Sequence, residues 1–414
     1  MKKHTGNEGL PTSEQRKGFL ERELRGKVRE WIEEMVNEEL DAALGMGWYE
    51  RGEVRRGYRK GKRMRSFTTR TGKHEIAMPR GAYHEAGPDG KKEWNSALLP
   101  RYARRTEEVE EAIVKSYLCG SNTRRVVHAL SPLLEGAALS KSTVSRIVAR
   151  LSVAFEAWRK RDLSHENIAV LFLDAIHLKI RLGRKVESIP VLAAIGVRQD
   201  GTRILLALEV RTSESEAAWN AMTEALAQRG VKTPVLAVID GNAGLRKAVK
   251  ATWPWIDVQR CTKHKLGNLY THAPKRHYDE IKEDYHAIAY AESEAKARRA
   301  YERFQKKWKK DCPGVVKSLE EGGEELLTFF RYPKTTWKML RTTNRIERMN
   351  EEFRRRVKTQ GSLPNTEAGL KLLYGLFASG LITLRRIDGW NDLAEIVQAK
   401  RMQHGLIASL HQAA

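Results

Sequence analysis

Two short apolar runs, each ending in an aspartate, constrain the fold of this 414-residue chain more than any other feature. They are Ile168-Ala-Val-Leu-Phe-Leu-Asp174 and Val235-Leu-Ala-Val-Ile-Asp240. Continuous apolar runs of this length are typical of strands that are buried on both faces of a sheet. The sequence therefore predicts a covered sheet with one carboxylate at or near the end of each of two strands.

A third acid, Glu347, lies in the polar segment Arg341-Thr-Thr-Asn-Arg-Ile-Glu347, which has the pattern of a helix start. Two strand-borne aspartates and one helix-borne glutamate supply the hard oxygen ligands that a two-metal phosphoryl-transfer site needs. Two Mg²⁺ (or Mn²⁺) ions about 4 Å apart would activate the attacking oxygen and stabilise the leaving one. We therefore predict that Asp174, Asp240 and Glu347 are catalytic metal ligands.

Each acid also has a purely structural interpretation. An aspartate that ends a strand commonly closes a turn or caps a helix, and Asp240-Gly-Asn fits a turn. Asn344 and Glu347 fit a capping box, in which Glu347 would support its own helix and bind no metal. The joint arrangement of three acids, and no single acid, favours the metal site.

Composition indicates a polyanionic partner. Lys and Arg number 75 against 52 Asp and Glu, which gives a formal charge of +23, and an excess of this size points to DNA or RNA. A merely basic or ribosome-associated protein is the alternative. No apolar run approaches the ~18 residues of a membrane span, and the N-terminus lacks the apolar stretch of a signal peptide. Three cysteines cannot form a fully paired disulfide set, so we expect a reduced, cytoplasmic protein.

The N-terminal hundred residues contain a predicted helix and a basic hairpin. Helical spacing of apolar residues from Phe19 to Leu44, ended by Gly45, predicts an amphipathic helix in region 1–47 that contacts a second copy, DNA or its own chain. Region 48–100 alternates on both sides of Thr71-Gly72 and predicts a β-hairpin. Its dense positive charge favours contacts with DNA phosphates over a solvated charge run. The predicted contacts are Arg55, Arg56, Arg59, Lys60, Lys62, Arg63 and Arg65.

Region 101–165 is predicted to be helical, with helices over 106–118, 120–130 and 139–151 and a loop over 132–138. Ser140 can cap the last helix. The pattern is similar to a helix-turn-helix, although the connection is longer than usual, and a small three-helix bundle is the alternative. In a helix-turn-helix, the last helix would enter the major groove of DNA. Its candidate base and phosphate contacts are Ser142, Thr143, Ser145 and Arg146.

Strand patterns begin at residue 166 and end near 261. Strands are predicted over 168–174, 188–197, 203–210, 235–240 and 255–260, with helices over 214–228 and 244–252. This order is that of an α/β ribonuclease H-like core, in which the first and fourth strands are neighbours. Asp174 and Asp240 would then lie side by side.

The rest of the chain is predicted to be helical. Region 262–341 is interpreted as an all-helical insertion, 342–390 as the second part of the core and 391–414 as a helical tail. The helix that carries Glu347 also carries Arg354, Arg355 and Arg356, cations that could hold a DNA strand beside the proposed metal site. An apolar helix over 367–386 is expected to pack against the sheet.

A Cys-x-x-His spacing follows the last predicted strand. Cys261 and His264 could begin a zinc site with His272 and His277. The spacing is irregular, however, and lacks a second cysteine, so we favour a brace for the segment that leaves the strand. His177 alternates to the strand face opposite Asp174 and is not expected to share its metal site.

The chain resembles bacterial insertion-sequence transposases of the Mutator-like family, a branch of the DDE transposases. The resemblance covers about residues 48 to 385 and is carried by 173–181, 194–201 and 214–219. Its most specific pieces are Gln259-Arg-Cys-Thr-Lys-His264 and Arg341-Thr-Thr-Asn-Arg-Ile-Glu-Arg-Met-Asn-Glu-Glu-Phe-Arg-Arg-Arg356. Gly361-Ser-Leu-Pro364 departs from the pattern, since an aromatic residue is expected before the proline.

The resemblance implies that Asp174, Asp240 and Glu347 are the catalytic acids and that Cys261 and His264 form the signature that follows the second aspartate. It implies cleavage of double-stranded DNA at terminal inverted repeats and transfer of the freed 3′-OH ends to target DNA. It also implies two Mg²⁺ or Mn²⁺ ions per site, a homodimer or higher homo-oligomer on DNA, and a bacterial, nucleoid-associated location. No membrane partner is implied.

Two other functions compete with this prediction. A catalytically inactive DNA-binding regulator descended from a transposase would bind DNA without metal-dependent cleavage. A general ribonuclease H-like nuclease or resolvase would cleave by DNA structure, without preference for inverted repeats. The presence of all three acids disfavours the first, and the basic hairpin and helix-turn-helix pattern disfavour the second.

Overall fold

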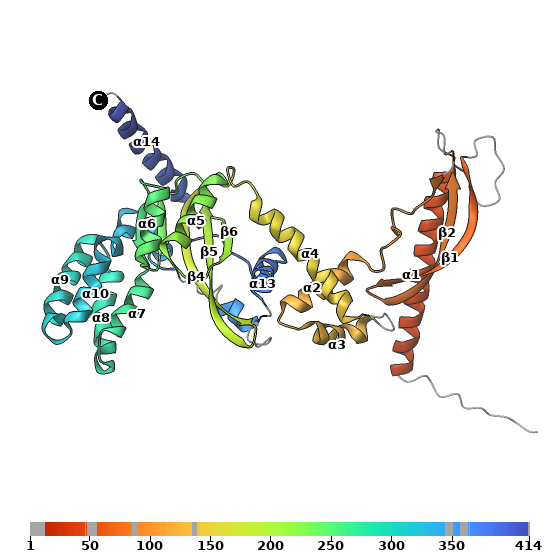
Figure 1. The fold of residues 1–414 in the computed structure, drawn as a ribbon, viewed down its shortest axis with the longest axis horizontal. Helices are drawn as coiled ribbons and strands as arrows, with labels where there is room; N and C mark the ends of the chain where they lie inside the picture. Colours follow the sequence, from red (N-terminus) through yellow and green to blue (C-terminus); the bar gives the residue numbers. More distant parts are fainter. Residues whose placement is uncertain are drawn as a thin grey trace, which may run out of the picture. The chain divides into compact units, whose positions relative to one another are not determined.

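The computed structural model describes residues 13–45, 47, 56–84, 90, 92–134, 139–343, 351–356, 363 and 365–412. The chain forms two compact units, Met1–Arg150 and Leu151–Ala414 (Figure 1). Among the described residues, none of the helices combines the length and the apolar character that a membrane crossing requires.

The first unit begins with a long helix packed on a hairpin. Helix α1 (Ser13–Leu44) ends before Gly45, whose φ of 71° ends the helix as predicted. Strands β1 (Gly57–Thr69) and β2 (Gly72–Tyr83) form the predicted hairpin, and β3 (Lys92–Glu93) extends it to a three-stranded sheet. Val36 of α1 packs with Phe67 and Ile76 of the strands in a small hydrophobic core.

The basic, glycine-containing segment from Gly57 to Arg65 is part of β1. The strands pair from Gly57↔Tyr83 to Thr69↔Gly72, and the register shifts between Arg59 and Lys62. Gly61 lies in that shift with a φ of 86°, a conformation that glycine adopts without steric cost.

Three helices complete the first unit: α2 (Glu107–Leu118), α3 (Thr123–Leu134) and α4 (Lys141–Lys160), of which the last runs on into the second unit. The predicted cap is confirmed, because Ser140 Oγ accepts the Thr143 N–H at 3.1 Å. Two boundaries were wrong. Helix α3 continues through Pro132 to Leu134, which is buried in the helical core, and α4 continues past Leu151 to Lys160.

The second unit contains a five-stranded mixed sheet. Its strands are β4 (Ile168–Leu182), β5 (Lys185–Arg198), β6 (Arg203–Val210), β7 (Leu236–Ile239) and β8 (Asp257–Arg260), in the order β6-β5-β4-β7-β8. The first three strands pair antiparallel, whereas β7 is parallel to β4 and β8 is parallel to β7. The prediction that the first and fourth strands are neighbours is confirmed.

One strand end was wrong. Strand β4 does not stop near Asp174 but continues to Leu182, which pairs with Lys185 of β5. The hairpin partner supplies hydrogen bonds to this extension, which the local apolar pattern could not indicate. Asp174 instead marks where β4 leaves its other neighbour, since the last β4–β7 pair is Phe172↔Val238.

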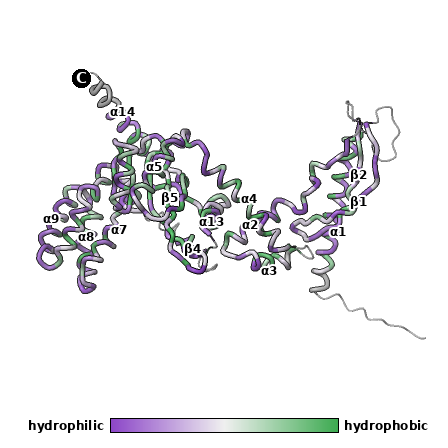
Figure 2. The backbone as a smooth tube through the Cα atoms, viewed as in Figure 1, coloured by the Kyte–Doolittle hydropathy of each residue, from purple (hydrophilic) through white to green (hydrophobic). Residues whose placement is uncertain are grey.

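Helices cover both faces of this sheet. Leu171 and Leu173 share a hydrophobic core with α5 (Glu216–Gln228) and α6 (Ala243–Thr252). On the alternate face, Leu178 packs so closely on α13 (Thr366–Ala378) that a Cβ at Gly369 would lie 2.9 Å from its Cδ1. Figure 2 shows hydrophobic residues along the sheet strands and mostly hydrophilic residues on α9. The helix predicted over 367–386 ends early, at Ala378, where Gly380 takes a φ of 71°.

The region between β8 and residue 341 is helical, as predicted. It contains α7 (Thr262–Thr271), α8 (Tyr278–Ala289), α9 (Glu294–Asp311), α10 (Pro313–Gly322) and α11 (Trp337–Leu340), with short 3-10 turns at Lys275–His277, Gly323–Leu326, Thr328–Arg331 and Lys334–Thr336. Helix α10 ends at Gly322, and the next residue, Gly323, takes a φ of 50°. The chain ends in a turn at Trp390–Asp392 and helix α14 (Leu393–Gln412).

Candidate functional site

The two predicted aspartates lie at matching positions along neighbouring strands, Asp174 within β4 and Asp240 directly after β7. Strands β4 and β7 pair with a constant offset of 66 residues, from Val170↔Leu236 (236 − 170) to Phe172↔Val238 (238 − 172). Asp174 follows Phe172 by two residues and Asp240 follows Val238 by two residues, so the two aspartates keep the same offset (240 − 174). Neighbouring strands lie about 4.8 Å apart, so the register places Asp240, directly after β7, next to Asp174, where β4 continues along β5.

The environments of the two carboxylates differ. Asp174 is 6% exposed, on the same strand face as Leu178 and therefore toward α13. Its Oδ1 accepts the N–H of Ala175 at 2.9 Å. Asp240 is half-buried at the end of β7, and its Oδ1 accepts the N–H of Asn242 at 2.9 Å. Backbone donors therefore orient one oxygen of each carboxylate.

A further acid, Glu214, lies in the loop before α5. Its main-chain oxygen accepts Asn242 Nδ2 at 3.2 Å, and its Oε1 lies 3.3 Å from His177 Nε2. Burial raises the pKa of Glu214, and the negative charge of Asp240 raises it further. This crowding of acids creates a negative potential that favours a bound cation. His177 is exposed on the strand face opposite Asp174, as predicted.

Glu347 lies outside the described residues, but the chain that leads to it is fixed up to Thr343. The N–H and Oγ1 of Thr262 donate to the Arg341 oxygen at 2.9 and 3.0 Å. The N–H and Oγ1 of Thr343 each lie 3.3 Å from Cys261 Sγ, and the hydroxyl is also 3.3 Å from His264 Nδ1.

Cys261 thus touches both parts of the candidate site. Its N–H donates to the oxygen of Ile239, the residue before Asp240, at 2.7 Å, while its sulfur holds Thr343. Burial alone would raise the pKa of the thiol, but the hydrogen bond and charge of His264 and the donors of Thr343 lower it overall. These contacts are those of the brace that the sequence favoured.

A zinc cluster is not found around this pair. Among the described residues, no group of three or more His, Cys, Asp and Glu side chains could hold a metal ion. The ring of His277 packs edge-on against Trp308 with 5.3 Å between centroids, and His272 lies against Gly314.

The polar residues around Cys261 are buried and join β8 to the helical region. Arg260 Nη2 donates to the oxygen of Gly241 at 2.9 Å, and its Nη1 donates to that of Glu321 at 3.1 Å. Lys265 is 1% exposed and donates to the Ser318 oxygen at 2.8 Å. Gln259 bonds both the Leu326 oxygen, at 3.1 Å, and the Phe329 N–H, at 2.8 Å. The loop after β7 is therefore tied to the helical region.

The hairpin residues that were predicted to contact DNA differ in their partners and in their exposure. Arg59 forms an ion pair with Asp41 of α1, and Arg65 donates to three main-chain oxygens. Both guanidinium groups therefore make contacts within the protein. Lys60 lies 3.6 Å from Glu93. Arg56, Lys62 and Arg63 are exposed, whereas Arg55 lies outside the described residues.

The other predicted DNA contacts lie on two helices. On α4, Ser142, Ser145 and Arg146 are exposed and Thr143 is half-buried, while Val144 and Ile147 face the helical core. Residues 351–356 are helical, with Arg355 and Arg356 paired to Glu352 and Arg354 exposed. Asn344 lies outside the described residues.

Comparison with known proteins gives the class of this chain. The model of the family described as "Transposase, Mutator family" matches residues 8–381. The chain therefore belongs to the Mutator family of transposases and is a DNA transposase.

Its relatives are transposases of bacterial insertion sequences. The chain is 33% identical over 391 residues to the transposase for insertion sequence element ISRM5 of Rhizobium meliloti, covering 94% of each chain. It is 33% identical to the transposase for IS1081 of Mycobacterium tuberculosis, covering 89% of this chain and 85% of that one. It is 31% identical to the transposase for IS256 in transposon Tn4001 of Staphylococcus aureus, covering 83% and 84%.

A solved structure of the Drosophila P element transposase strand transfer complex aligns with 71% of this chain and 84% of that chain. The two chains share 13% sequence identity, with a TM-score of 0.30.

Proposed function

We propose that the chain is a DDE-type transposase whose catalytic acids are Asp174, Asp240 and Glu347, on a ribonuclease H-like core. The observation that carries the proposal is the register of β4 and β7, which brings Asp174 and Asp240 to matching positions on neighbouring strands. The sheet order β6-β5-β4-β7-β8, with three antiparallel strands followed by two parallel ones, supports this core.

The donor set fits Mg²⁺ or Mn²⁺. Carboxylate oxygens are the ligands that these ions prefer. Burial is the main cause of the raised pKa of Glu214, and the negative charge of the neighbouring Asp240 adds to it. When bound by Asp174, Asp240 and Glu347, two such ions would supply Lewis-acid stabilisation of charge on the phosphate being cleaved.

The protein's own residues would position these ligands. Backbone donors orient Asp174 and Asp240, and the contacts of Cys261, Thr262 and His264 fix the chain up to Thr343, four residues before Glu347. Arg354 on the following helical residues would hold the DNA strand by its phosphates. Water, and then the freed 3′-OH, would act as nucleophiles, so no covalent protein–DNA intermediate is needed.

The first unit is proposed to bind the terminal inverted repeats through the exposed basic residues of the hairpin and the polar N-terminal turn of α4. The names of the relatives, transposases for insertion sequence elements, support such ends as the DNA substrate. A homodimer or higher homo-oligomer on paired ends is part of this proposal.

The test is Mg²⁺-dependent cleavage of a duplex that carries the element's end, with wild type beside Asp240→Ala. We expect a 3′-OH at the element end in wild type, and loss of cleavage with retained DNA binding in the variant. Cleavage that persists in Asp240→Ala would overturn the assignment of Asp240. DNA binding without cleavage by wild type, with several metals and pre-paired ends, would favour a DNA-binding regulator.

A further inference from the structure

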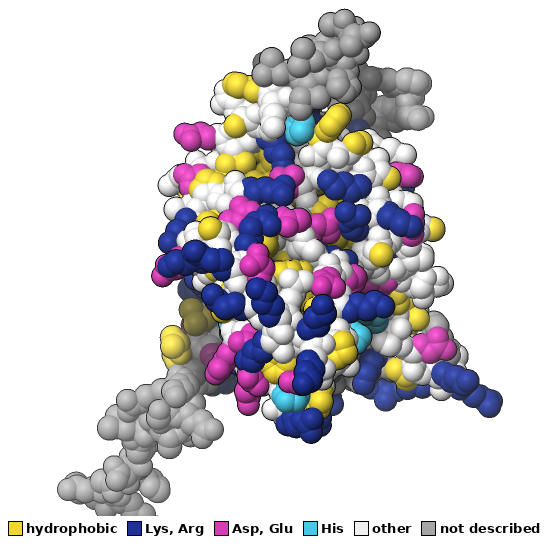
Figure 3. Space-filling view, turned by 90° about the vertical axis from the view of Figure 1, so that its left-hand side faces the viewer, with side chains coloured by type: hydrophobic (Ala, Val, Ile, Leu, Met, Phe, Trp, Pro, Cys, Tyr) yellow, Lys and Arg dark blue, Asp and Glu magenta, His cyan; other side chains and the backbone are white. Residues whose placement is uncertain are grey.

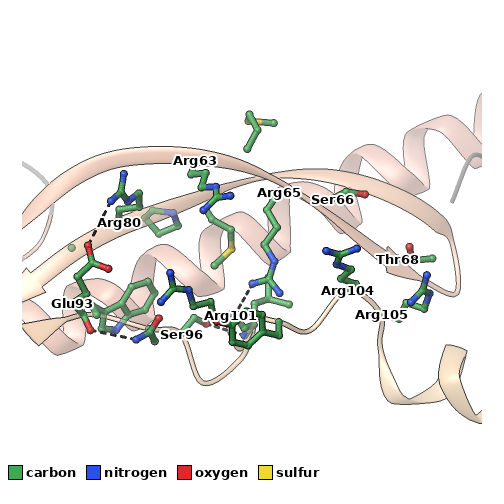
Figure 4. A pocket seen from close by; sticks show the side chains of 18 of the residues that line it. Arg63, Arg65, Ser66, Thr68, Arg80, Glu93, Ser96, Arg101, Arg104 and Arg105 are labelled. Atoms are coloured by element: carbon green, nitrogen blue, oxygen red, sulfur yellow. Dashed lines mark hydrogen bonds and ion pairs between the residues drawn. The ribbon is translucent and has the colours of Figure 1, made fainter. Parts of the chain in front are cut away.

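A basic groove of about 810 Å³ lies within the first unit, between the hairpin and the segment that follows β3. One wall consists of β1 and β2 and includes Arg63, and the other includes Arg101, Tyr102 and Arg104. Figure 4 shows the arginines of both walls spread along the length of the hairpin. Arg101, Tyr102 and Arg104 precede helix α2 and are not among the residues predicted above to contact DNA.

The second wall is held in a fixed position. Arg65 on β1 donates to the main-chain oxygens of Leu99 and Pro100, at 3.0 and 2.7 Å, and of Ala103. The N–H of Thr68 donates to the Arg104 oxygen at 3.0 Å, and the N–H of Thr106 donates to the Thr68 oxygen at 3.0 Å. Arg65 therefore holds the segment that forms the second wall of the groove. Because this segment is ordered before any ligand binds, the entropic cost of binding is lower.

Positive charge in the groove greatly exceeds negative charge. Seven lining residues are Arg or Lys and one, Glu93, is an acid; the basic residues are Arg63, Arg65, Lys73, Arg80, Arg101, Arg104 and Arg105. Arg80 lies 3.6 Å from Glu93, and Lys73 lies 2.8 Å from Glu75. No ion pair joins Arg63, Arg101 or Arg104 to a carboxylate among the described residues of this unit.

The cations that line the groove act on one another. Burial lowers the pKa of Arg65, and the positive charges of Arg104 and Arg63 lower it further. Like charges that face one another across a concave surface repel, so a bound polyanion would relieve repulsion that the free protein carries.

The groove also presents apolar surface beside its charge. Tyr102 is 86% exposed, and the Arg101 guanidinium lies 5.9 Å from the centroid of the tyrosine ring. Met64 on the hairpin is 60% exposed. Exposed aromatic rings between arginines are typical of surfaces that contact sugars and bases as well as phosphates.

We propose that this groove holds one sugar–phosphate strand of DNA, with Arg101 and Arg104 binding phosphates opposite Arg63 and with Tyr102 against a sugar or base. Because the cations are spread along the groove, they fit a linear polyanion better than a single phosphate. The groove is comparable in volume to a pocket for one drug-sized ligand, so it accommodates one strand's backbone and not a whole double helix. The choice of DNA over other polyanions rests on the proposed function.

The experiment compares two double variants of the full-length protein. Arg101→Gln/Arg104→Gln removes two charges from the groove, and Arg299→Gln/Arg303→Gln removes two exposed charges from α9. Figure 3 shows that on the face formed by the helical region, Lys and Arg are interspersed with Asp and Glu. Affinity for a duplex of the element's end is measured by fluorescence anisotropy at several salt concentrations, and circular dichroism checks folding.

We expect the groove variant to lower affinity and to reduce the slope of log K against log salt by about 1.8, because each lost phosphate contact removes about 0.9. The α9 variant should leave the slope unchanged. A slope that the groove variant leaves unchanged with both the duplex and single-stranded DNA, or an equal change in both variants, would overturn the proposal. A single-stranded oligonucleotide is the second arm, and a loss confined to it would assign the groove to unpaired DNA.

The active-site proposal and the groove proposal can each be refuted without the other. Mg²⁺-dependent cleavage is measured on the same wild-type preparation. If wild type does not cleave, the active-site proposal fails while the comparison of salt slopes remains valid. If wild type cleaves and the groove variant keeps its slope, only the groove fails. Tyr102→Ala is a second check on the groove, with an expected loss of affinity and an unchanged slope, since it removes contact area but no charge.

Discussion

Thr343 is the residue through which the brace at Cys261 is expected to act on Glu347, the proposed catalytic glutamate. It is fully buried, and its hydroxyl contacts both Cys261 Sγ and His264 Nδ1 at 3.3 Å. Thr343→Val keeps the shape and the main-chain N–H but removes that hydroxyl. Losing its hydrogen bonds and leaving a buried partner unsatisfied costs about 1–3 kcal/mol of folding free energy. In a domain of this size, each kcal/mol lowers Tm by about 2–4 °C.

The effect on catalysis should exceed the effect on stability. Glu347 follows Thr343 by four residues, so a loosened brace would shift its carboxylate, and a misplacement of about 1 Å can cost roughly 10²-fold in rate. We expect single-turnover cleavage of the element's end, measured well below Tm, to fall about 10- to 100-fold, with the affinity for DNA unchanged.

The matched control is Thr342→Val, at the neighbouring position. Thr342 is 8% exposed, and its side chain makes no hydrogen bond with the described residues. The control should cleave at the wild-type rate. Equal rates for the two variants would refute a positioning role for Thr343, and a loss of DNA affinity in Thr343→Val would mean that the brace acts on binding instead.

Three further predictions concern the same unit. Mg²⁺ at a hundred times its Kd should raise the free energy of unfolding by about 2.7 kcal/mol in calorimetry, and Asp240→Asn should abolish this gain. The pKa of Glu214 is raised above its usual 4.5, so the native state binds this proton more tightly and stability falls as pH rises from 4.5 through the folded pKa. Glu214→Gln should remove that fall, and the pH dependence of urea unfolding without metal would show whether it does. Lys265→Met should cost about 1–3 kcal/mol in urea unfolding, because the Ser318 oxygen loses its donor. Lys317→Met, at an exposed position, is the control, and an equal loss there would contradict the role of Lys265.

Local patterns predicted the elements well where the chain itself sets their ends. Strand β6 has the predicted bounds, 203 and 210, because turn residues flank it, and α1 ends at the predicted glycine. Ends that depend on a partner were wrong. Strand β4 continues to Leu182 only because β5 pairs with it, and α3 passes Pro132 with Leu134 buried against the other helices.

The candidate site was predictable in part. Strand order alone placed Asp174 beside Asp240, and the observed register agrees. Glu214 was missed as a neighbour of Asp240, although its segment was among the pieces that carry the family resemblance. The contacts of Thr343 with Cys261 join residues 82 positions apart, a separation at which no local pattern carries information.

Residue types and their order along the chain by themselves determined the paired acids, the strand order that makes them neighbours, the basic character and the family. The acids, the strand order and the basic character follow from the pattern and composition of the residues, and the family follows from the resemblance of its motifs; none of these depends on distant contacts. Only the tertiary structure decided which Arg and Lys side chains are left available to contact a ligand. Arg59 and Arg65 share one strand with Arg63, yet the first two are used inside the fold, because packing brought Asp41 and the oxygens of Leu99, Pro100 and Ala103 within reach. The same packing placed Arg101 and Arg104 opposite Arg63 and formed the groove.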